Sequence, residues 1–143
     1  MTGREYPTRP LIGIGVIVLR PEAVLLVRRG QQPAMGEWSL PGGAQELGET
    51  AEATARRELA EETGLAVGDL HLVGYFDSIH RDEEGRIRFH YTILDFAAAY
   101  ASGEARAGSD VAELVWAPVA ELGPFRLRAQ ALAMIARAGA ILA

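Results

Sequence analysis

Two short apolar segments lie near the start of the chain, at residues 11–19 and 23–27, and both are rich in valine and isoleucine. Three residues, Arg20-Pro21-Glu22, separate them, so the pattern predicts a β-hairpin. Residues 28–48 are instead dense in glycine, proline and glutamine and hold few large apolar side chains. This stretch predicts a loop of unusual length, and long loops in compact domains tend to be functional.

The rest of the chain alternates between helical and strand patterns. Residues 49–63 combine alanines with interleaved acids and arginines and predict the clearest helix of the sequence. Residues 125–138 place apolar side chains at helical spacing, which predicts a final amphipathic helix packed on the sheet. Further strands are expected at residues 70–79, 87–99 and 114–117, the first two as a pair around a polar turn. Strands, helix, strands and helix in this order favour an α+β (mixed α/β) layered fold.

Composition and charge narrow the class of protein. The chain has 143 residues, 49% apolar and 23% charged, which is typical of a globular protein and predicts one domain over residues 1–143. It has no cysteine, which excludes disulfides, thiolate metal sites and cysteine nucleophiles. Its formal net charge of -5 disfavours binding to nucleic acid. The apolar run at 11–19 is too short to span a membrane, so we expect a cytoplasmic protein.

Three acidic residues near the end of the first predicted helix share one face. Glu58, Glu61 and Glu62 are spaced i, i+3 and i+4, so their carboxylates converge and repel one another. The helix dipole also disfavours anions in this last turn. A hard divalent cation such as Mg²⁺, which prefers oxygen ligands, would explain why acids gather there. The alternative is a solvated acidic face with Arg56 and Arg57 as local partners.

The loop before this helix ends in Gly42-Gly43, where the backbone can approach a ligand closely and turn a carbonyl toward it. From Gly43 onward the residues resemble the Nudix hydrolase box at every specified position. The matching residues are Gly43, Glu49, Arg57-Glu58-Leu59, Glu61-Glu62 and Gly64-Leu65. A preceding Gly-x-Trp-x-Leu-Pro-Gly-Gly segment extends the resemblance at lower specificity.

This resemblance implies a fold, a reaction and roles for individual residues. The fold would be an α/β/α sandwich with a mixed sheet between helices. The reaction would be Mg²⁺-dependent hydrolysis of a nucleoside diphosphate linked to another group, with Mn²⁺ able to substitute. The three helix glutamates would be metal ligands or the base that activates water, and the Gly42 carbonyl would be a further ligand. Arg57 would pair with Glu49 and brace the loop against the helix. Some members of the family take the base from a later loop, for which this chain offers Glu83, Glu84, Asp110 and Glu113.

Four residues are candidates for substrate binding. Arg28 and Arg29 follow the second predicted strand and could meet a phosphate through bidentate hydrogen bonds, although solvated strand-end arginines are equally compatible with the sequence. Gly43 allows a close approach of the backbone to the substrate. Trp38 could stack on a base or, alternatively, anchor the loop to the core.

The resemblance leaves the substrate open. Residues 38–43 and 89–96 resemble ADP-ribose or NDP-sugar hydrolases, but His80 stands where ADP-ribose enzymes often carry a proline. A MutT-like enzyme that cleaves (d)NTPs is the alternative. A domain that binds a nucleotide without cleaving it belongs to another class, and such domains commonly lose box carboxylates that this chain keeps. The expected partner is a small nucleotide, with no nucleic acid and no membrane, and a homodimer is compatible with the sequence.

Overall fold

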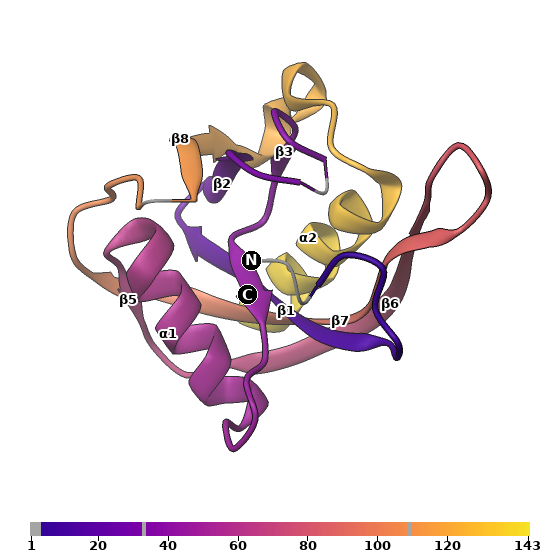
Figure 1. Ribbon diagram of the computed structural model, residues 1–143. Coiled ribbons are helices and arrows are strands. Elements are labelled where there is room, and N and C mark those ends of the chain that lie inside the picture. The colour runs from indigo at the N-terminus through magenta and orange to yellow at the C-terminus, as the bar shows by residue number, and fades with distance from the viewer. Residues whose placement is uncertain (1–3, 33, 109) are drawn as a thin grey trace.

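The computed structural model describes residues 4–32, 34–108 and 110–143. Within these ranges the chain forms one sheet of eight strands and two α-helices (Figure 1). The strands are β1 (Leu11–Arg20), β2 (Ala23–Arg29), β3 (Trp38–Ser39), β4 (Gly42–Ala44), β5 (Ala66–Val67), β6 (His71–Arg81), β7 (Ile87–Ser102) and β8 (Val111–Pro118). The helices are α1 (Ala51–Thr63) and α2 (Ala129–Leu142), and two 3₁₀ turns, Val119–Glu121 and Gly123–Phe125, connect β8 to α2.

Strand β1 lies at the centre of the sheet and has partners on both edges. It pairs antiparallel with β2 at one end, where Leu19 faces Val24, and with β4 at the other end, where Gly15 faces Gly42. On its second edge it pairs in parallel with β7 along residues 11–19. The predicted hairpin is therefore confirmed. The parallel partner comes from far along the chain, because parallel strands need a long crossover connection.

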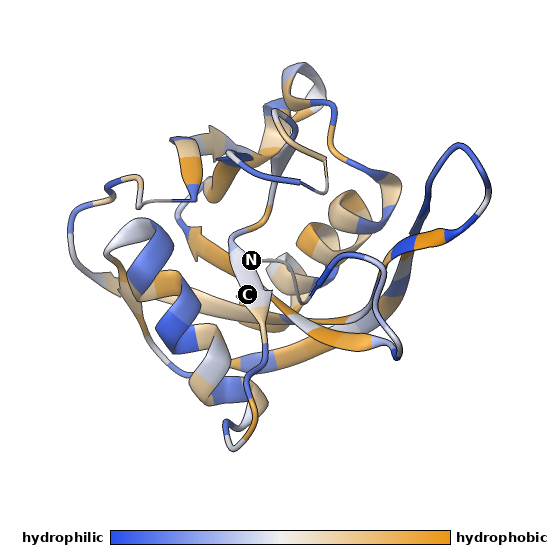
Figure 2. Ribbon diagram, viewed as in Figure 1, coloured by the Kyte–Doolittle hydropathy of each residue, from blue (hydrophilic) through white to orange (hydrophobic). Residues whose placement is uncertain are grey.

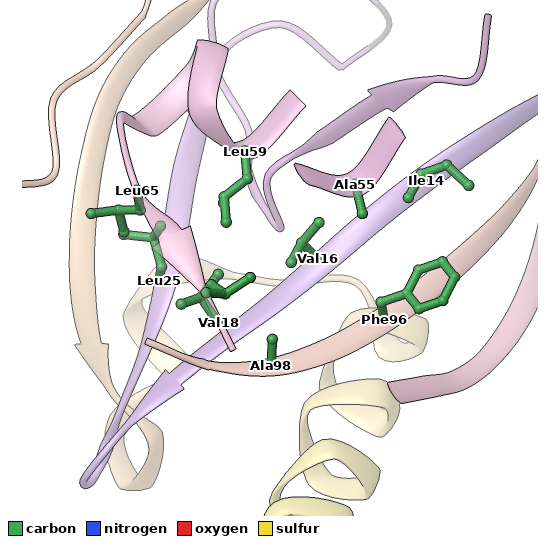
Figure 3. Close-up of a cluster of buried hydrophobic side chains, with 10 residues drawn as sticks. Ile14, Val16, Val18, Leu25, Ala55, Leu59, Leu65, Phe96 and Ala98 are labelled. Atoms are coloured by element: carbon green, nitrogen blue, oxygen red, sulfur yellow. The ribbon is translucent and has the colours of Figure 1, made fainter. Parts of the chain in front are cut away.

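Two apolar clusters cover the two faces of this sheet. Along β1, Val16 and Val18 point into the cluster under α1, whereas Ile17 points into the cluster under α2. Figure 3 shows the first cluster, in which Ala55 and Leu59 of α1 face the strands. A strand buried on both faces has a nearly continuous apolar sequence, and in β1 residues 11–19 are all apolar or glycine, which Figure 2 draws as orange and pale bands. The helix, sheet and helix layers confirm the expected mixed α/β sandwich.

The helices differ from their predicted bounds for local reasons. Helix α1 begins at Ala51 rather than at residue 49, because the Thr50 side chain caps it by accepting a hydrogen bond from the Ala53 N–H at 3.0 Å. Helix α2 begins at Ala129 rather than at residue 125, because Arg126 has a φ of 51° and a helix cannot continue through that conformation. None of the helices in the described ranges is long and apolar enough to cross a membrane.

The predicted long loop at residues 28–48 is only partly irregular. It contains β3, which pairs with β2, and β4, which pairs with β1. These strands have two and three residues, too few to show an alternating pattern, and only their pairing with β2 and β1 makes them strands. The same reason explains why the sequence did not predict β5, which pairs with β7. The short strand β4 brings two glycines of the loop beside α1.

Candidate active site

A cavity of about 720 Å³ lies beside the C-terminal half of α1, a volume in the range of small-ligand sites. Glu58, Glu61 and Glu62 of α1 line it, and so do Gly42 and Gly43 of β4. The fold therefore brings the helix carboxylates and the paired glycines of the loop to the same cavity.

Glu62 is bound directly to the glycine strand. Its Oε1 atom accepts a hydrogen bond from the Gly42 N–H at 2.8 Å. Burial of the side chain disfavours the charged form and raises the pKa of Glu62 to about 7, although the Gly42 hydrogen bond opposes this shift. The carboxyl is thus held at the edge of β4 in surroundings that leave its negative charge poorly compensated.

Glu58 lies against the next residue of the same strand. A Cβ atom at position 43 would collide with the Glu58 carboxylate, so this contact requires glycine. The Glu58 side chain is 14% exposed, and burial raises its pKa, while a hydrogen bond of 2.8 Å from Arg57 Nη1 opposes the shift. Two partly buried carboxylates, Glu58 and Glu62, therefore meet Gly42 and Gly43 from the helix.

Arg57 organises the acidic side chains around it. Its Nε and Nη2 atoms donate to the two carboxylate oxygens of Glu49 at 2.6 and 2.9 Å, and Nη2 also donates to the Ala44 carbonyl at 3.3 Å. This bidentate pair lowers the pKa of Glu49 to about 2. Because Glu49 precedes α1 and Ala44 ends β4, the guanidinium ties the loop between them to the helix. The Arg57–Glu49 pair that the resemblance implied is thus present in the structure.

Glu61 behaves differently from the other two helix glutamates. Its side chain is 56% exposed, and its Oε2 atom accepts a hydrogen bond from Arg57 Nη1 at 3.1 Å. The structure thus brings Glu58 and Glu62 onto the glycine strand, whereas Glu61 lies at the cavity rim.

The donor set at this wall fits a hard divalent cation. Within the described ranges, no three His, Cys, Asp or Glu side chains lie close enough together to hold a metal by themselves. Mg²⁺ commonly takes only one or two protein carboxylates and completes its shell with water and substrate phosphates. Glu58 and Glu62 supply those carboxylates beside the Gly42-Gly43 backbone, and a cation there would offset the uncompensated charge that burial creates.

Comparison with known proteins agrees with this geometry. The family model of the NUDIX domain matches residues 9–138. The chain belongs to the NUDIX family. Its box begins at Gly43 in β4 and ends at Leu65, just after α1.

Individual relatives extend this comparison. The chain is 36% identical over 104 residues to the ADP-ribose pyrophosphatase of Methanocaldococcus jannaschii, a match that covers 73% of the chain but only 59% of that relative. It is 39% identical over 106 residues to the putative 8-oxo-dGTP diphosphatase 2 of Mycobacterium tuberculosis, covering 73% of this chain and 71% of the other. The crystal structure of a MutT NUDIX hydrolase from Burkholderia pseudomallei is similar with a TM-score of 0.77 and 29% identity, over 90% of this chain and 98% of that chain.

The residues expected to bind substrate lie in different places of this NUDIX fold. Arg29 and Trp38 line the cavity with Gly43, but Arg28 is not among the lining residues. Arg28 donates to Glu113 Oε1 at 2.8 Å and to the Gly36 carbonyl at 3.1 Å. The Trp38 ring packs edge-on against Phe125 at 5.4 Å between centroids, so it also anchors β3 to the core under α2.

The later acids that the family pattern suggested as bases are also dispersed. Asp110 lines the cavity and accepts a hydrogen bond from Gln31 at 2.9 Å. Glu113 pairs with Arg28, and Glu83 and Glu84 are exposed in the turn between β6 and β7. Of these four candidates, the fold brings only Asp110 to the cavity.

Asp95 also lines the cavity and was not predicted from the sequence as a site residue. It lies in β7 and is 1% exposed, whereas residues 87–99 were predicted only as a strand. The available signal was a single acid within the otherwise apolar residues 93–99, since buried carboxylates are rare unless they have a partner.

Proposed function

We propose that this NUDIX protein hydrolyses the pyrophosphate linkage of a small nucleotide with Mg²⁺, which Mn²⁺ can replace. We propose ADP-ribose or an NDP-sugar as the substrate class. The observation that carries the proposal is the convergence of Glu58 and Glu62 on Gly42-Gly43 at the cavity wall. The complete box and a relative named ADP-ribose pyrophosphatase support it.

The roles of the residues follow from this geometry. When bound, the cation would neutralise charge on the phosphate oxygens and lower the pKa of water. Glu58, Glu62 and the Gly42 carbonyl would hold it, and Glu61 would become a further ligand only if its side chain turned away from Arg57. Arg57 would orient Glu58 by donating to its carboxylate, as the 2.8 Å contact allows.

Two further steps need a proton acceptor and a substrate anchor. The proton of the attacking water would pass to a box glutamate or to Asp110, the later acid that lines the cavity. Arg29 can donate to a phosphate, and Trp38 can stack on a base, since both side chains line the same cavity.

The alternative substrate class is a (d)NTP, cleaved to a nucleoside monophosphate and pyrophosphate. The similarity to a putative 8-oxo-dGTP diphosphatase supports it, as does His80 at the place where ADP-ribose enzymes often carry a proline. The non-catalytic sensor is a third hypothesis, and the full set of box carboxylates argues against it. One domain, a cytoplasmic location, no nucleic-acid partner and a homodimer remain predictions from the sequence.

Product analysis decides between these functions. The purified chain is incubated with Mg²⁺ and, separately, ADP-ribose, a UDP-sugar, the common dNTPs and 8-oxo-dGTP. AMP and ribose 5-phosphate from ADP-ribose support the first substrate class, and a monophosphate with pyrophosphate supports the second. Turnover should vanish with EDTA and return with Mg²⁺ or Mn²⁺. Tight binding of an intact nucleotide without cation-dependent turnover would overturn the proposal in favour of a sensor.

A further inference from the structure

The middle of strand β7 contains an acid that has no partner. Asp95 is 1% exposed. Its neighbours along the strand, Leu94 and Phe96, belong to the apolar cluster under α1, so an acid at this position is unexpected. Its Oδ2 atom is buried and accepts no hydrogen bond from any described residue. Buried polar atoms are nearly always paired, so an unpaired carboxylate oxygen in a cavity-lining residue indicates a partner that the chain itself does not supply.

Glycines flank Asp95 on both neighbouring strands. It faces Gly15 of β1 and Gly74 of β6 in the strand register. A Cβ at Gly15 would collide with Asp95 Oδ1, and a Cβ at Gly74 would lie 3.1 Å from Met134 Cε. Glycine weakens the interior of a strand, and one reason for its presence there is the close approach of another group. Gly15 in particular leaves room for the carboxyl group.

Asp95 lies two strands across the sheet from Gly42, the residue that donates to Glu62, and all three line the same cavity. The row Gly42, Gly15 and Asp95 crosses the adjacent strands β4, β1 and β7. Adjacent strands are about 4.8 Å apart, so Asp95 lies roughly 10 Å from the Gly42 end of the cavity. This span is comparable to a nucleoside. A ligand with its phosphates at Glu58 and Glu62 can therefore bring its attached group to Asp95.

The walls beside Asp95 suit a flat heterocycle. Tyr91 and Ile93 share its face of β7 by strand alternation, and Phe76 of β6 faces Ile93 in the register. All three line the same cavity. Aromatic and apolar walls with one buried polar atom are typical of a site that orients a ring by a hydrogen bond. His80 also lines the cavity, but no group of three or more His, Cys, Asp or Glu residues in the described ranges could hold a cation there.

Resting on the function proposed above, we propose that Asp95 is a specificity-determining residue whose carboxylate accepts a hydrogen bond from an N–H group of the substrate's nucleobase. A base without an N–H group would leave the buried carboxylate unpaired. Sites built around such a hydrogen bond reject analogues that lack it far more strongly than apolar pockets reject a wrong shape. Burial raises the pKa of Asp95 to about 7, as expected of a carboxyl group that lacks this partner in the free chain.

The test compares nucleotides that differ only in the base. ATP, GTP and ADP-ribose each have N–H donors on the base, and the matching purine riboside derivatives have none. For the best substrate of the three, we expect kcat/KM to fall at least about tenfold in the donor-free analogue. In Asp95→Leu this ratio should shrink to within about threefold, whereas Asp95→Asn, which keeps an acceptor oxygen, should retain part of it. Asp69→Asn, an exposed acid outside the cavity lining, should keep the wild-type ratio.

The outcomes separate this inference from the proposed function. If the wild-type chain turns over nucleotides without preferring the donor-bearing base, or if both Asp95 variants keep the full preference, the role of Asp95 is refuted while hydrolysis stands. If no nucleotide is hydrolysed, the proposed function fails. Calorimetry then tests Asp95 by itself, by measuring the affinities of the wild type and of Asp95→Asn for ADP-ribose and for its donor-free analogue. If each protein binds the two ligands with equal affinity, the role of Asp95 is refuted. Asp95→Asn keeps the side-chain volume, so the test does not depend on Asp95→Leu folding.

Discussion

Two glycines of the sheet each lie against a carboxylate, one from helix α1 and one from strand β7, and the two carboxylates differ in their hydrogen-bond partners. At Gly43 and at Gly15, an added Cβ would collide with the carboxylate of Glu58 or Asp95, respectively. Glu58 receives a hydrogen bond from Arg57, whereas the Oδ2 atom of Asp95 is buried without any partner in the described chain.

This difference indicates which chemical group a ligand must supply at each site. At the helix end, the chain supplies Arg57 and holds the carboxylates in place before any ligand arrives. In β7, the chain supplies only space, so the ligand must bring the donor. At one end of the cavity the carboxylates are thus held in place to bind a cation. At the other end a single carboxylate can recognise the ligand through one hydrogen bond. Four substitutions test this contrast.

Glu62→Gln should have the largest effect, because it removes a charge from the end of the cavity where the carboxylates are held in place. We expect turnover to fall at least about a hundredfold. The fold should be intact or slightly more stable, since a repelling charge has gone. Initial rates and thermal unfolding measure the two effects. Glu52→Gln, an exposed acid in the first turn of the same helix, should keep wild-type turnover. Native rates in Glu62→Gln would remove this glutamate from the mechanism.

Gly43→Ala should have the next largest effect, because the new Cβ displaces the Glu58 carboxylate. A small misplacement of a reacting group is costly, so we expect turnover to fall about tenfold or more with little loss of stability. Gly139→Ala provides the control, since an added Cβ in α2 meets nothing within 4 Å. It should keep full activity and raise the melting temperature slightly. Equal activity in the two alanine variants would show that Glu58 does not need its position.

Gly15→Ala should affect recognition more than turnover, because it displaces Asp95 and leaves Glu58 and Glu62 untouched. We expect the preference for a donor-bearing base to drop, with turnover of the donor-free analogue within about threefold of wild type. The ratio of kcat/KM values measures this change. A uniform loss across all substrates, with the preference intact, would instead mean that the new methyl group disturbs the sheet and not the recognition of the base.

Asp95→Asn should produce the smallest effect, a shift in stability that depends on pH. The folded pKa of about 7 lies above the ordinary aspartate value of 3.8, so the native state binds a proton that the unfolded state releases between these values. Wild-type stability therefore falls as pH rises from about 4 to 7 and stays lower above pH 7. Asparagine does not titrate, so its melting temperature relative to wild type should rise by a few degrees from pH 5 to pH 8. If the difference in melting temperature between Asp95→Asn and the wild type is the same at pH 5 and pH 8, Asp95 is not buried without a partner.

Much of the helix end was predictable because its signals are local. The spacing of Glu58 and Glu62 fixes them on one helix face, and Gly64, with a φ of 75°, ends α1 at the predicted residue. The positions and partners of Glu61 and Arg28 were not predictable in this way. Glu61 contacts Arg57 at the rim, and Arg28 pairs with Glu113 of β8, a strand far along the chain. Local spacing carries no information about such partners.

The sequence by itself determined the apolar strands, the acidic helix and membership of the family, because periodicity, caps and motif spacing act over a few residues. Only the tertiary structure decided which residues share the cavity. The parallel pairing of β1 with β7 places Asp95 opposite Gly15, and the pairing of β1 with β4 brings Gly42 to the same row. A shift of one residue in either register would turn these side chains to the other face, and register depends on contacts between distant segments.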